Sequence, residues 1–203
     1  MYRDQQRVSS ALRLILGFIA LVATFTSIGY LPVSAGEASP RGVDLTGKAI
    51  DPLRATPGEP VVLIFIRTDC PISNRYAPTI QRLSSRYTGK AVFWLVYPDK
   101  AESSAAIAQH LRDYGYKLPA LRDPQHSLVK LGQAQITPEA AVFDASGQLV
   151  YHGRIDNWYK EFGRARPAPT THELDDAIQA ALKGEKPQVA TTDAVGCYIS
   201  DLE

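Results

Sequence analysis

The sequence predicts an α/β domain whose elements follow the order βαβα and then ββα. Two uninterrupted apolar runs carry this prediction, Val61-Val-Leu-Ile-Phe-Ile66 and Ala91-Val-Phe-Trp-Leu-Val-Tyr97. Runs of this kind are typical of parallel strands that are buried on both faces. Each run is followed by apolar residues at helical spacing, so we expect right-handed strand-helix-strand crossovers.

The two helices of the first half are predicted from apolar stripes that end at a glycine. The first stripe, before Gly89, has spacings of four, three and four residues: Tyr76, Ile80, Leu83 and Tyr87. The second stripe, before Gly115, consists of Ile107, Leu111 and Tyr114. Shorter elements are expected as a hairpin or edge strand over residues 43–53, a third strand over 118–121 and a helix from His126 to Leu131.

The pattern changes in the second half of the chain. Residues 140–144 and 149–155 flank Ala145-Ser-Gly147, which predicts an antiparallel hairpin. A final helix is expected before Gly184, with Thr170 and Glu173 as a capping box at its start. The sequence therefore predicts a single domain with a central mixed sheet flanked by helices.

The two ends of the chain differ in composition from this domain. Residues 1–35 combine Arg3, Arg7 and Arg13 with an apolar run and small residues at Val33-Ser-Ala35, which predicts a signal peptide or, if uncleaved, a membrane anchor. We expect the domain over residues 36–184 to lie outside the cytoplasm, periplasmic or secreted, and to contact membrane only through an uncleaved N-terminal segment. A polar tail over residues 185–203 follows. The formal net charge of +1 gives no reason to expect a nucleic acid partner.

The chemistry is expected at Cys70, which lies four residues after the first buried run and just before a helix. The free amides and partial positive charge of a helix N-terminus stabilise a thiolate and make it reactive. Pro71 suits the first helical turn, where its missing N–H costs nothing. The only other cysteine of the chain, Cys197, lies in the tail. The pair permits either a structural disulfide or a redox cycle.

The segment Asp69-Cys70-Pro71-Ile72-Ser73 after a strand, with Pro78 eight residues beyond Cys70, resembles the thioredoxin-like redoxins. Ile136-Thr137-Pro138 before the hairpin resembles the cis-proline loop of that family. The resemblance implies a thioredoxin-like fold, a cis Pro138 that faces Cys70, and a backbone at Thr137 that docks an incoming thiol or peptide. We expect no bound metal or other cofactor.

Departures from the subfamilies leave the exact group open. A dithiol thioredoxin would have cysteine at position 73, and a copper-handling Sco-like protein would have one at position 74; the chain has Ser73 and Asn74. Leu63 and Arg67 stand where a typical peroxiredoxin places proline and threonine. The resemblance is therefore to the broader alkyl hydroperoxide reductase/thiol-specific antioxidant group.

The remaining polar residues near the motifs have weaker signals. Arg154 resembles the arginine with which peroxiredoxins stabilise a thiolate, and Asp69 and Pro71 are expected to support Cys70. None of the four histidines has metal-ligand spacing. We expect His110 and His172 to be surface or capping residues and His126 to approach the site.

These observations favour an exported thiol-disulfide oxidoreductase or antioxidant enzyme acting on protein or small-molecule thiols and disulfides. Cys70 would be the nucleophile, and Cys197 would resolve the mixed disulfide or sulfenic acid. Three alternatives stay open at this stage: a peroxidase acting on peroxide, a non-enzymatic module that binds copper or assembles a metal site, and a purely structural Cys70–Cys197 disulfide.

Overall fold

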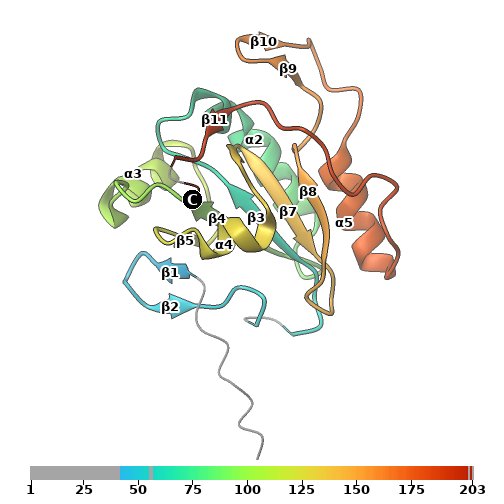
Figure 1. Ribbon diagram of the computed structural model, residues 1–203, viewed down its shortest axis with the longest axis horizontal. Helices are drawn as coiled ribbons and strands as arrows, with labels where there is room; N and C mark the ends of the chain where they lie inside the picture. The colour runs from blue at the N-terminus through green and yellow to red at the C-terminus, as the bar shows by residue number, and fades with distance from the viewer. Residues whose placement is uncertain (1–41, 55–56, 201, 203) are drawn as a thin grey trace, which may run out of the picture. The chain divides into compact units, whose positions relative to one another are not determined.

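The computed structural model describes residues 42–54, 57–200 and 202, and the predicted signal segment lies outside these residues. A seven-stranded mixed sheet has the strand order β2-β1-β5-β4-β3-β7-β8 and helices packed around it (Figure 1). Its strands are β1 (Gly42–Asp44), β2 (Ala49–Ile50), β3 (Val61–Phe65), β4 (Val92–Tyr97), β5 (Ala120–Arg122), β7 (Glu139–Phe143) and β8 (Leu149–Gly153). The helices are α2 (Pro71–Arg86), α3 (Ser104–Asp113), α4 (Ser127–Gly132) and α5 (Glu173–Lys183).

The central strand is β3, as its uninterrupted apolar sequence predicts. It pairs in parallel with β4 over five residues and antiparallel with β7 on its other side. β4 in turn pairs in parallel with β5, so the first half of the chain is the predicted α/β unit. The predicted hairpin forms β7 and β8, and the sheet is therefore mixed.

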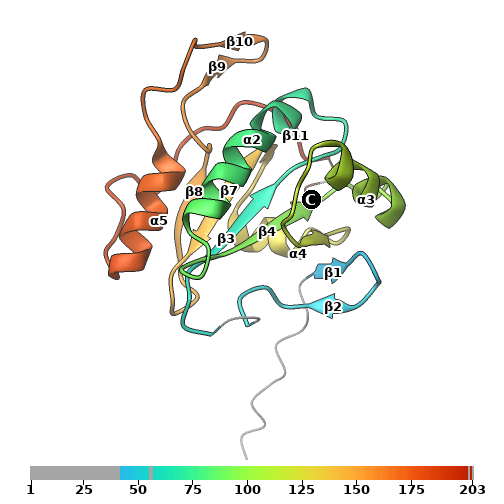
Figure 2. The same ribbon diagram turned by 180° about the vertical axis from the view of Figure 1, so that it is seen from behind.

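The sheet separates two apolar layers because side chains alternate across β3. One face presents Val62 and Ile64 to a core that also includes buried residues of α2, α3 and α5. The opposite face presents Leu63 and Phe65 to a second core that includes α4. Figure 2 shows α2 and α5 on the side of the sheet turned toward the viewer. The chain thus forms the predicted single domain over the residues that the structure describes after position 41.

The first apolar stripe correctly predicts the buried face of α2, whereas the stripe of α3 is only partly right, because Ile107 is buried but Tyr114 is exposed. Tyr76, Ile80, Leu83 and Tyr87 are all buried, with α2 ending one residue before Tyr87. The glycine signal also holds for α5, where Gly184 follows the last helical residue in the left-handed conformation at φ +70°. The hairpin at residues 43–53 is present as β1 and β2, and β1 joins the sheet beside β5.

The predicted capping box of the last helix is wrong. The helix starts at Glu173, with His172 at the N-cap position and no side-chain capping hydrogen bond. Thr170 is instead hydrogen-bonded to Asn157. The Asn157 side chain donates to the Thr170 hydroxyl and accepts from the Thr170 amide. A contact between segments 13 residues apart therefore replaces the local cap.

Two small pairings were not predicted. The first is the antiparallel pair β9 (Tyr159–Glu161) and β10 (Arg164–Ala165). The second joins β6 (Ile136–Thr137) to β11 (Cys197–Tyr198), so the C-terminal tail returns to the domain. Both views show the tail running from α5 to β11, near the start of α2 (Figures 1 and 2).

The buried carboxylate of Asp123 organises the connection from β5 to the segment that carries β6. It is 1% exposed and accepts from the amides of Ser127, Leu128 and Val129 at 2.8–2.9 Å. These are among the amides that a helix start leaves without backbone partners. Asp123 therefore fixes α4 in place ahead of the loop that faces Cys70.

Replacing Asp123 with Ala leaves these amides without their acceptor and should lower the free energy of unfolding by about 3 kcal/mol. The matched control is Asp144→Ala, which removes a similar cap in the exposed turn between β7 and β8, where water replaces the lost acceptor. We expect the control to cost about 1 kcal/mol. Urea unfolding followed by circular dichroism measures both, and equal losses would contradict the assigned role of Asp123.

Candidate functional site

Cys70 is the N-cap residue of α2 and lies at the end of the loop that leaves β3. Its sulfur is fully buried and accepts a hydrogen bond from the Ser73 amide at 3.5 Å. Pro71 takes the first helical position, as predicted. The amide and the positive end of the helix both favour a negative charge on this sulfur.

The loop before Cys70 is held at Thr68 by two residues from other elements. The Thr68 amide donates to the Glu102 carboxylate at 2.6 Å, and the Thr68 carbonyl accepts from the Asn74 side-chain amide at 3.0 Å. Glu102 is buried, and this burial raises the pKa of its carboxyl despite the hydrogen bond from Thr68. Both backbone groups of Thr68 are therefore fixed, which restricts the position of the loop that carries Cys70.

A buried histidine completes this brace. His110 contacts the Asn74 side-chain oxygen through Nε2 and the Tyr97 hydroxyl through Nδ1, both at 2.8 Å. Since an amide oxygen only accepts, Nε2 carries the proton and Nδ1 accepts from tyrosine. Burial lowers the pKa of His110 and keeps the ring neutral. The prediction that His110 is a surface or capping residue is wrong, because its side chain reaches back under the loop.

The loop before β7 faces Cys70, and the Thr137–Pro138 peptide bond is cis, as the resemblance implies. The Thr137 carbonyl accepts from the Cys70 thiol at 3.1 Å. The buried Glu139 carboxylate accepts from the amides of Gln135 and Ile136 at 2.8 and 3.0 Å. This carboxylate holds the β6 backbone beside the sulfur.

Strand β11 carries Cys197 to the same place. Cys197 pairs with Thr137 and Tyr198 with Ile136 in an antiparallel register. The Thr137 hydroxyl also donates to the Cys197 carbonyl at 3.3 Å, and the Cys197 thiol lies within hydrogen-bonding distance of Cys70. Both cysteines are free thiols. The structure therefore brings together the two cysteines, Thr137 and Pro138.

The contact between the thiols separates their pKa values. Burial raises the pKa of Cys70, but hydrogen bonds from the Cys197 thiol and from Ser73 outweigh it, and the net pKa is lowered. A side-chain hydrogen bond from Thr137 lowers the Cys70 pKa further, whereas the Thr137 carbonyl favours the protonated thiol because a carbonyl only accepts. Burial and the neighbouring Cys70 thiolate raise the pKa of Cys197 to about 12. Cys70 is thus the thiolate of the pair and Cys197 the hydrogen-bond donor.

The tail is fixed upstream of β11 along the outer strand β8. The His152 amide donates to the Ala190 carbonyl at 3.0 Å, and the Thr192 amide donates to the His152 carbonyl at 3.2 Å. At Gly153 an added Cβ would lie 2.3 Å from the Thr192 hydroxyl, so only glycine lets the tail cross here. These contacts restrict the positions that Cys197, further along the tail, can take.

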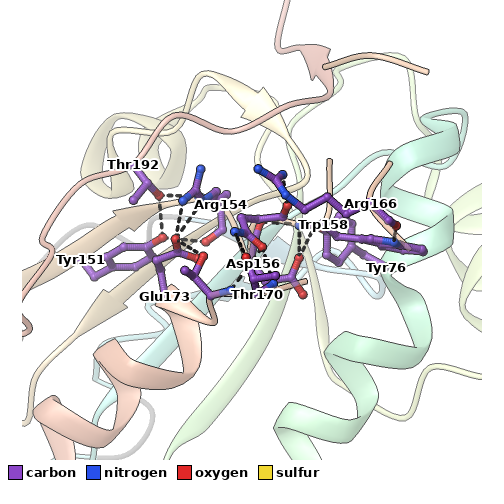
Figure 3. A network of polar contacts seen from close by, with 11 residues as sticks. Tyr76, Tyr151, Arg154, Asp156, Trp158, Arg166, Thr170, Glu173 and Thr192 are labelled. Carbon is purple, nitrogen blue, oxygen red and sulfur yellow. Dashed lines mark hydrogen bonds and ion pairs between the residues drawn. The ribbon is translucent and has the colours of Figure 1, made fainter. Parts of the chain in front are cut away.

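Two predicted supporting residues have other partners. Asp69 is exposed and pairs with Arg67 at 2.9 Å, while Arg67 also pairs with Asp99 at 3.0 Å. Arg154 forms an ion pair with Glu173, and its amide donates to the Thr192 hydroxyl (Figure 3). The contacts of Arg154 therefore brace α5 and the tail, and its predicted role at the thiolate has no contact to support it.

Tyr76, which the sequence places in the apolar stripe of α2, belongs to the same polar network. Its hydroxyl donates to the Asp156 carboxylate at 2.6 Å, and the Asp156 carboxylate also accepts from the Trp158 amide (Figure 3). The Tyr76 and Trp158 rings meet edge to face at 5.4 Å. This contact fixes the segment after β8 to α2.

Two further histidines of the sequence analysis have other environments. His126 is buried against the Pro98 carbonyl, and His172 is exposed.

Within the described part of the chain, no three His, Cys, Asp or Glu side chains are grouped as metal ligands. In residues 42–54, 57–200 and 202, no helix is long and apolar enough to cross a bilayer. Sequence reasoning missed Asn74, Glu102 and His110. The sequence marks Asn74 only as a position where a Sco-like protein would have cysteine. No local pattern marks Glu102 or His110, because their partners Thr68 and Asn74 lie at least 34 residues away in the sequence.

Residues 42–152 match the AhpC/TSA family, and the chain belongs to this family of thioredoxin-like redoxins. A comparison with curated protein sequences found no match.

Solved structures share the fold at low sequence identity. A hypothetical protein from Sinorhizobium meliloti 1021 has a TM-score of 0.66 and 22% identity, with 79% of this chain and 91% of that chain covered. An uncharacterized conserved protein from Geobacillus kaustophilus has a TM-score of 0.67 and 21% identity, covering 79% and 89%. The exposed lipoprotein thioredoxin of Streptococcus pneumoniae has a TM-score of 0.52 and 24% identity, covering 72% and 99%. The predicted thioredoxin-like fold is confirmed.

The hydrogen bond between the thiols predicts how Cys70 titrates. In the parent, the alkylation rate of Cys70 by iodoacetamide should rise with pH around a midpoint below the ordinary 9.0, because only the thiolate reacts. Cys197→Ala removes the donor that stabilises this thiolate, so the midpoint should move to higher pH. Mass spectrometry of the Cys70 peptide measures the rate. Tyr198→Ala, which truncates an exposed neighbour, is the control, and coincident profiles for Cys197→Ala and the parent would refute the contact.

Proposed function

We propose that this redoxin is an exported thiol-disulfide oxidoreductase in which Cys70 is the nucleophile and Cys197 resolves. The observation that carries the proposal is the pairing of β11 with β6, which presents the Cys197 thiol to the buried Cys70 sulfur. Membership of the AhpC/TSA family supports an oxidoreductase. Export is supported by the sequence pattern of residues 1–35.

The proposed cycle balances with two cysteines and one external disulfide. The Cys70 thiolate attacks one sulfur of the partner disulfide, and the partner's other sulfur leaves with the electron pair as a thiolate. Cys197 then loses its proton to the leaving group or to solvent and attacks the Cys70 sulfur. The partner leaves reduced and a Cys70–Cys197 disulfide remains. An external dithiol resets the two thiols and is itself oxidised.

The geometry explains why the second step follows the first. While Cys70 is a thiolate, burial and the contact with that thiolate together raise the Cys197 pKa to about 12, so Cys197 stays protonated. Once Cys70 is part of a mixed disulfide, that negative charge is gone and the Cys197 pKa falls. The resolving thiol is therefore activated by formation of the mixed disulfide itself.

The two single-cysteine variants separate the two roles. With a low-molecular-weight aromatic disulfide in excess, Cys70→Ser should show no exchange at the site, whereas Cys197→Ser should stop at a stable mixed disulfide on Cys70. The parent should proceed to a species lighter by two hydrogens than the dithiol form. Intact-mass spectrometry of quenched samples distinguishes all three products. Turnover by Cys70→Ser at the parent's rate would refute the proposal.

The same samples test the other activities that the sequence leaves open. Fast peroxide consumption with a sulfenic acid on Cys70 would identify a peroxidase, and stoichiometric uptake of Cu(I) by the two thiols would identify a copper-binding module. Resistance of a Cys70–Cys197 bond to mild reductant in the folded state would identify a structural disulfide.

A further inference from the structure

A cavity of about 450 Å³ lies between α2 and the segment that joins β8 to α5. Cys70 is not among its lining residues, and the proposed redox cycle does not use it. Leu83 of the helix and Trp158 of the segment contribute to its apolar walls. Ligand sites in proteins commonly have volumes of roughly 300–1,000 Å³. The cavity therefore has the size of a binding site.

Three arginines of α2 line this cavity. Arg75, Arg82 and Arg86 are seven and four positions apart, so they lie on one face of the helix. Arg86 is paired with Asp175 at 2.7 Å. In the described part of the chain, no carboxylate pairs with the other two. Arg75 lies 5.3 Å from the centre of the Trp158 ring, and Arg82 donates to a hydroxyl of its own helix at 2.8 Å. Two guanidinium groups are therefore available to an anion.

The two carboxylates that line the cavity are less accessible than its arginines. Asp156 is 5% exposed and accepts from two donors inside the fold (Figure 3). The Asp175 side chain is 14% exposed and is already bound by Arg86. Arg75 and Arg82 are both exposed. The accessible charge of the cavity is therefore positive, which matches an anionic ligand.

The wall opposite α2 is held in place by its own hydrogen bonds. The Arg166 amide donates to the Trp158 carbonyl at 2.7 Å, and the Trp158 indole donates to the Arg166 carbonyl at 2.9 Å. Pro167 and Pro169 follow in the cavity wall, and each proline fixes one backbone angle. The contact of Arg75 with the Trp158 ring also restricts that guanidinium. A ligand therefore meets a preformed surface, which reduces the entropy lost on binding.

A second, apolar hollow lies between this cavity and the start of α2. Arg75 lines both hollows, and the second one also includes Ile72, two residues after Cys70, and the exposed Phe162 of the turn between β9 and β10. At a rise of 1.5 Å per residue, Arg75 lies roughly 8 Å and Arg82 roughly 18 Å from Cys70 along the axis of α2. A partner that lies along α2 would therefore contact both arginines while its sulfur reacts at Cys70.

We propose that the cavity is an exosite, a binding site away from the reacting sulfur, for an acidic segment of the protein partner. Two carboxylates of the segment bind Arg75 and Arg82, and an apolar side chain between them lies against the cavity walls. The two arginines are roughly 10 Å apart along the helix axis, which equals about three residues of extended chain. The inference rests on the proposed function and adds a substrate class, partners with acidic residues near their reactive cysteine.

The first experiment measures binding alone, by calorimetry with the reduced parent. The probe is Gly-Gly-Glu-Ala-Leu-Glu-Gly-Gly, blocked at both ends and free of cysteine, and the control peptide has glutamine in place of both glutamates. Arg75→Gln and Arg82→Gln should each weaken binding of the glutamate peptide about fivefold, and together about twentyfold, since each removes one charged pair. Arg112→Gln, which removes the same charge from an exposed position of α3, should match the parent. Added salt should weaken binding to the parent more than to the double variant.

The second experiment measures the link to the redox site in Cys197→Ser protein, in which Cys70 alone reacts. The glutamate peptide carries a cysteine joined to thiopyridine, three residues before the first glutamate in one version and three residues after the last in the other. The Cys70 thiolate attacks the peptide sulfur, and thiopyridine leaves with the electron pair. The rate should fall about tenfold in Arg75→Gln/Arg82→Gln for at least one version. The rate with neutral dipyridyl disulfide should stay unchanged.

Equal affinity of the glutamate peptide for the parent and the double variant would overturn the proposal, as would equal affinity of the parent for the two peptides. Glutarate binding as tightly as the glutamate peptide would assign the cavity to a small anion instead. Peptide rates that do not respond to the double variant in either version would separate the cavity from the redox site and overturn the exosite. Failure of the proposed function looks different, because Cys70 would then react with neither the peptides nor dipyridyl disulfide, while peptide binding would still depend on the arginines.

Discussion

The pairing of β11 with β6 is the contact on which the proposed chemistry of this redoxin depends. Two register pairs place Cys197 opposite Thr137, whose carbonyl already faces the Cys70 sulfur at 3.1 Å. Without this pairing, Cys70 would be a buried thiol at a helix start, stabilised only by Ser73 and the helix dipole. With it, the sulfur gains a second thiol that donates a hydrogen bond and that we propose as the resolving thiol.

The rest of the domain keeps the two halves of this contact in place. Glu102, Asn74 and His110 fix the loop before Cys70, and Glu139 fixes the backbone of β6. The tail is anchored on both sides of Cys197. Before it, Thr192 binds the backbone of β8, and after it, Ile199 is buried in the core.

The sequence predicts the long elements and Cys70 because each has a local signal. Apolar runs mark β3 and β4, spacings of three and four mark α2, and the position of Cys70 after a strand marks a thiolate site. The cis Pro138 follows from the resemblance rather than from local sequence. The pairing of Cys197 with the site has no such signal, since β6 and β11 are two residues each and 197 − 70 = 127 positions separate the cysteines. For the same reason the capping box at Thr170 and the exposure of His110 were predicted wrongly, because long-range partners replaced the local ones.

The most direct test of this account is a redox titration of the folded protein in thiol-disulfide buffers of graded potential, with acid quenching, alkylation and intact-mass analysis. We predict a single two-electron transition in which both cysteines lose their alkylatable thiols together, with a mass change of two hydrogens and no dimer. Independent oxidation of Cys70 and Cys197, or two alkylatable thiols at every potential, would contradict the account.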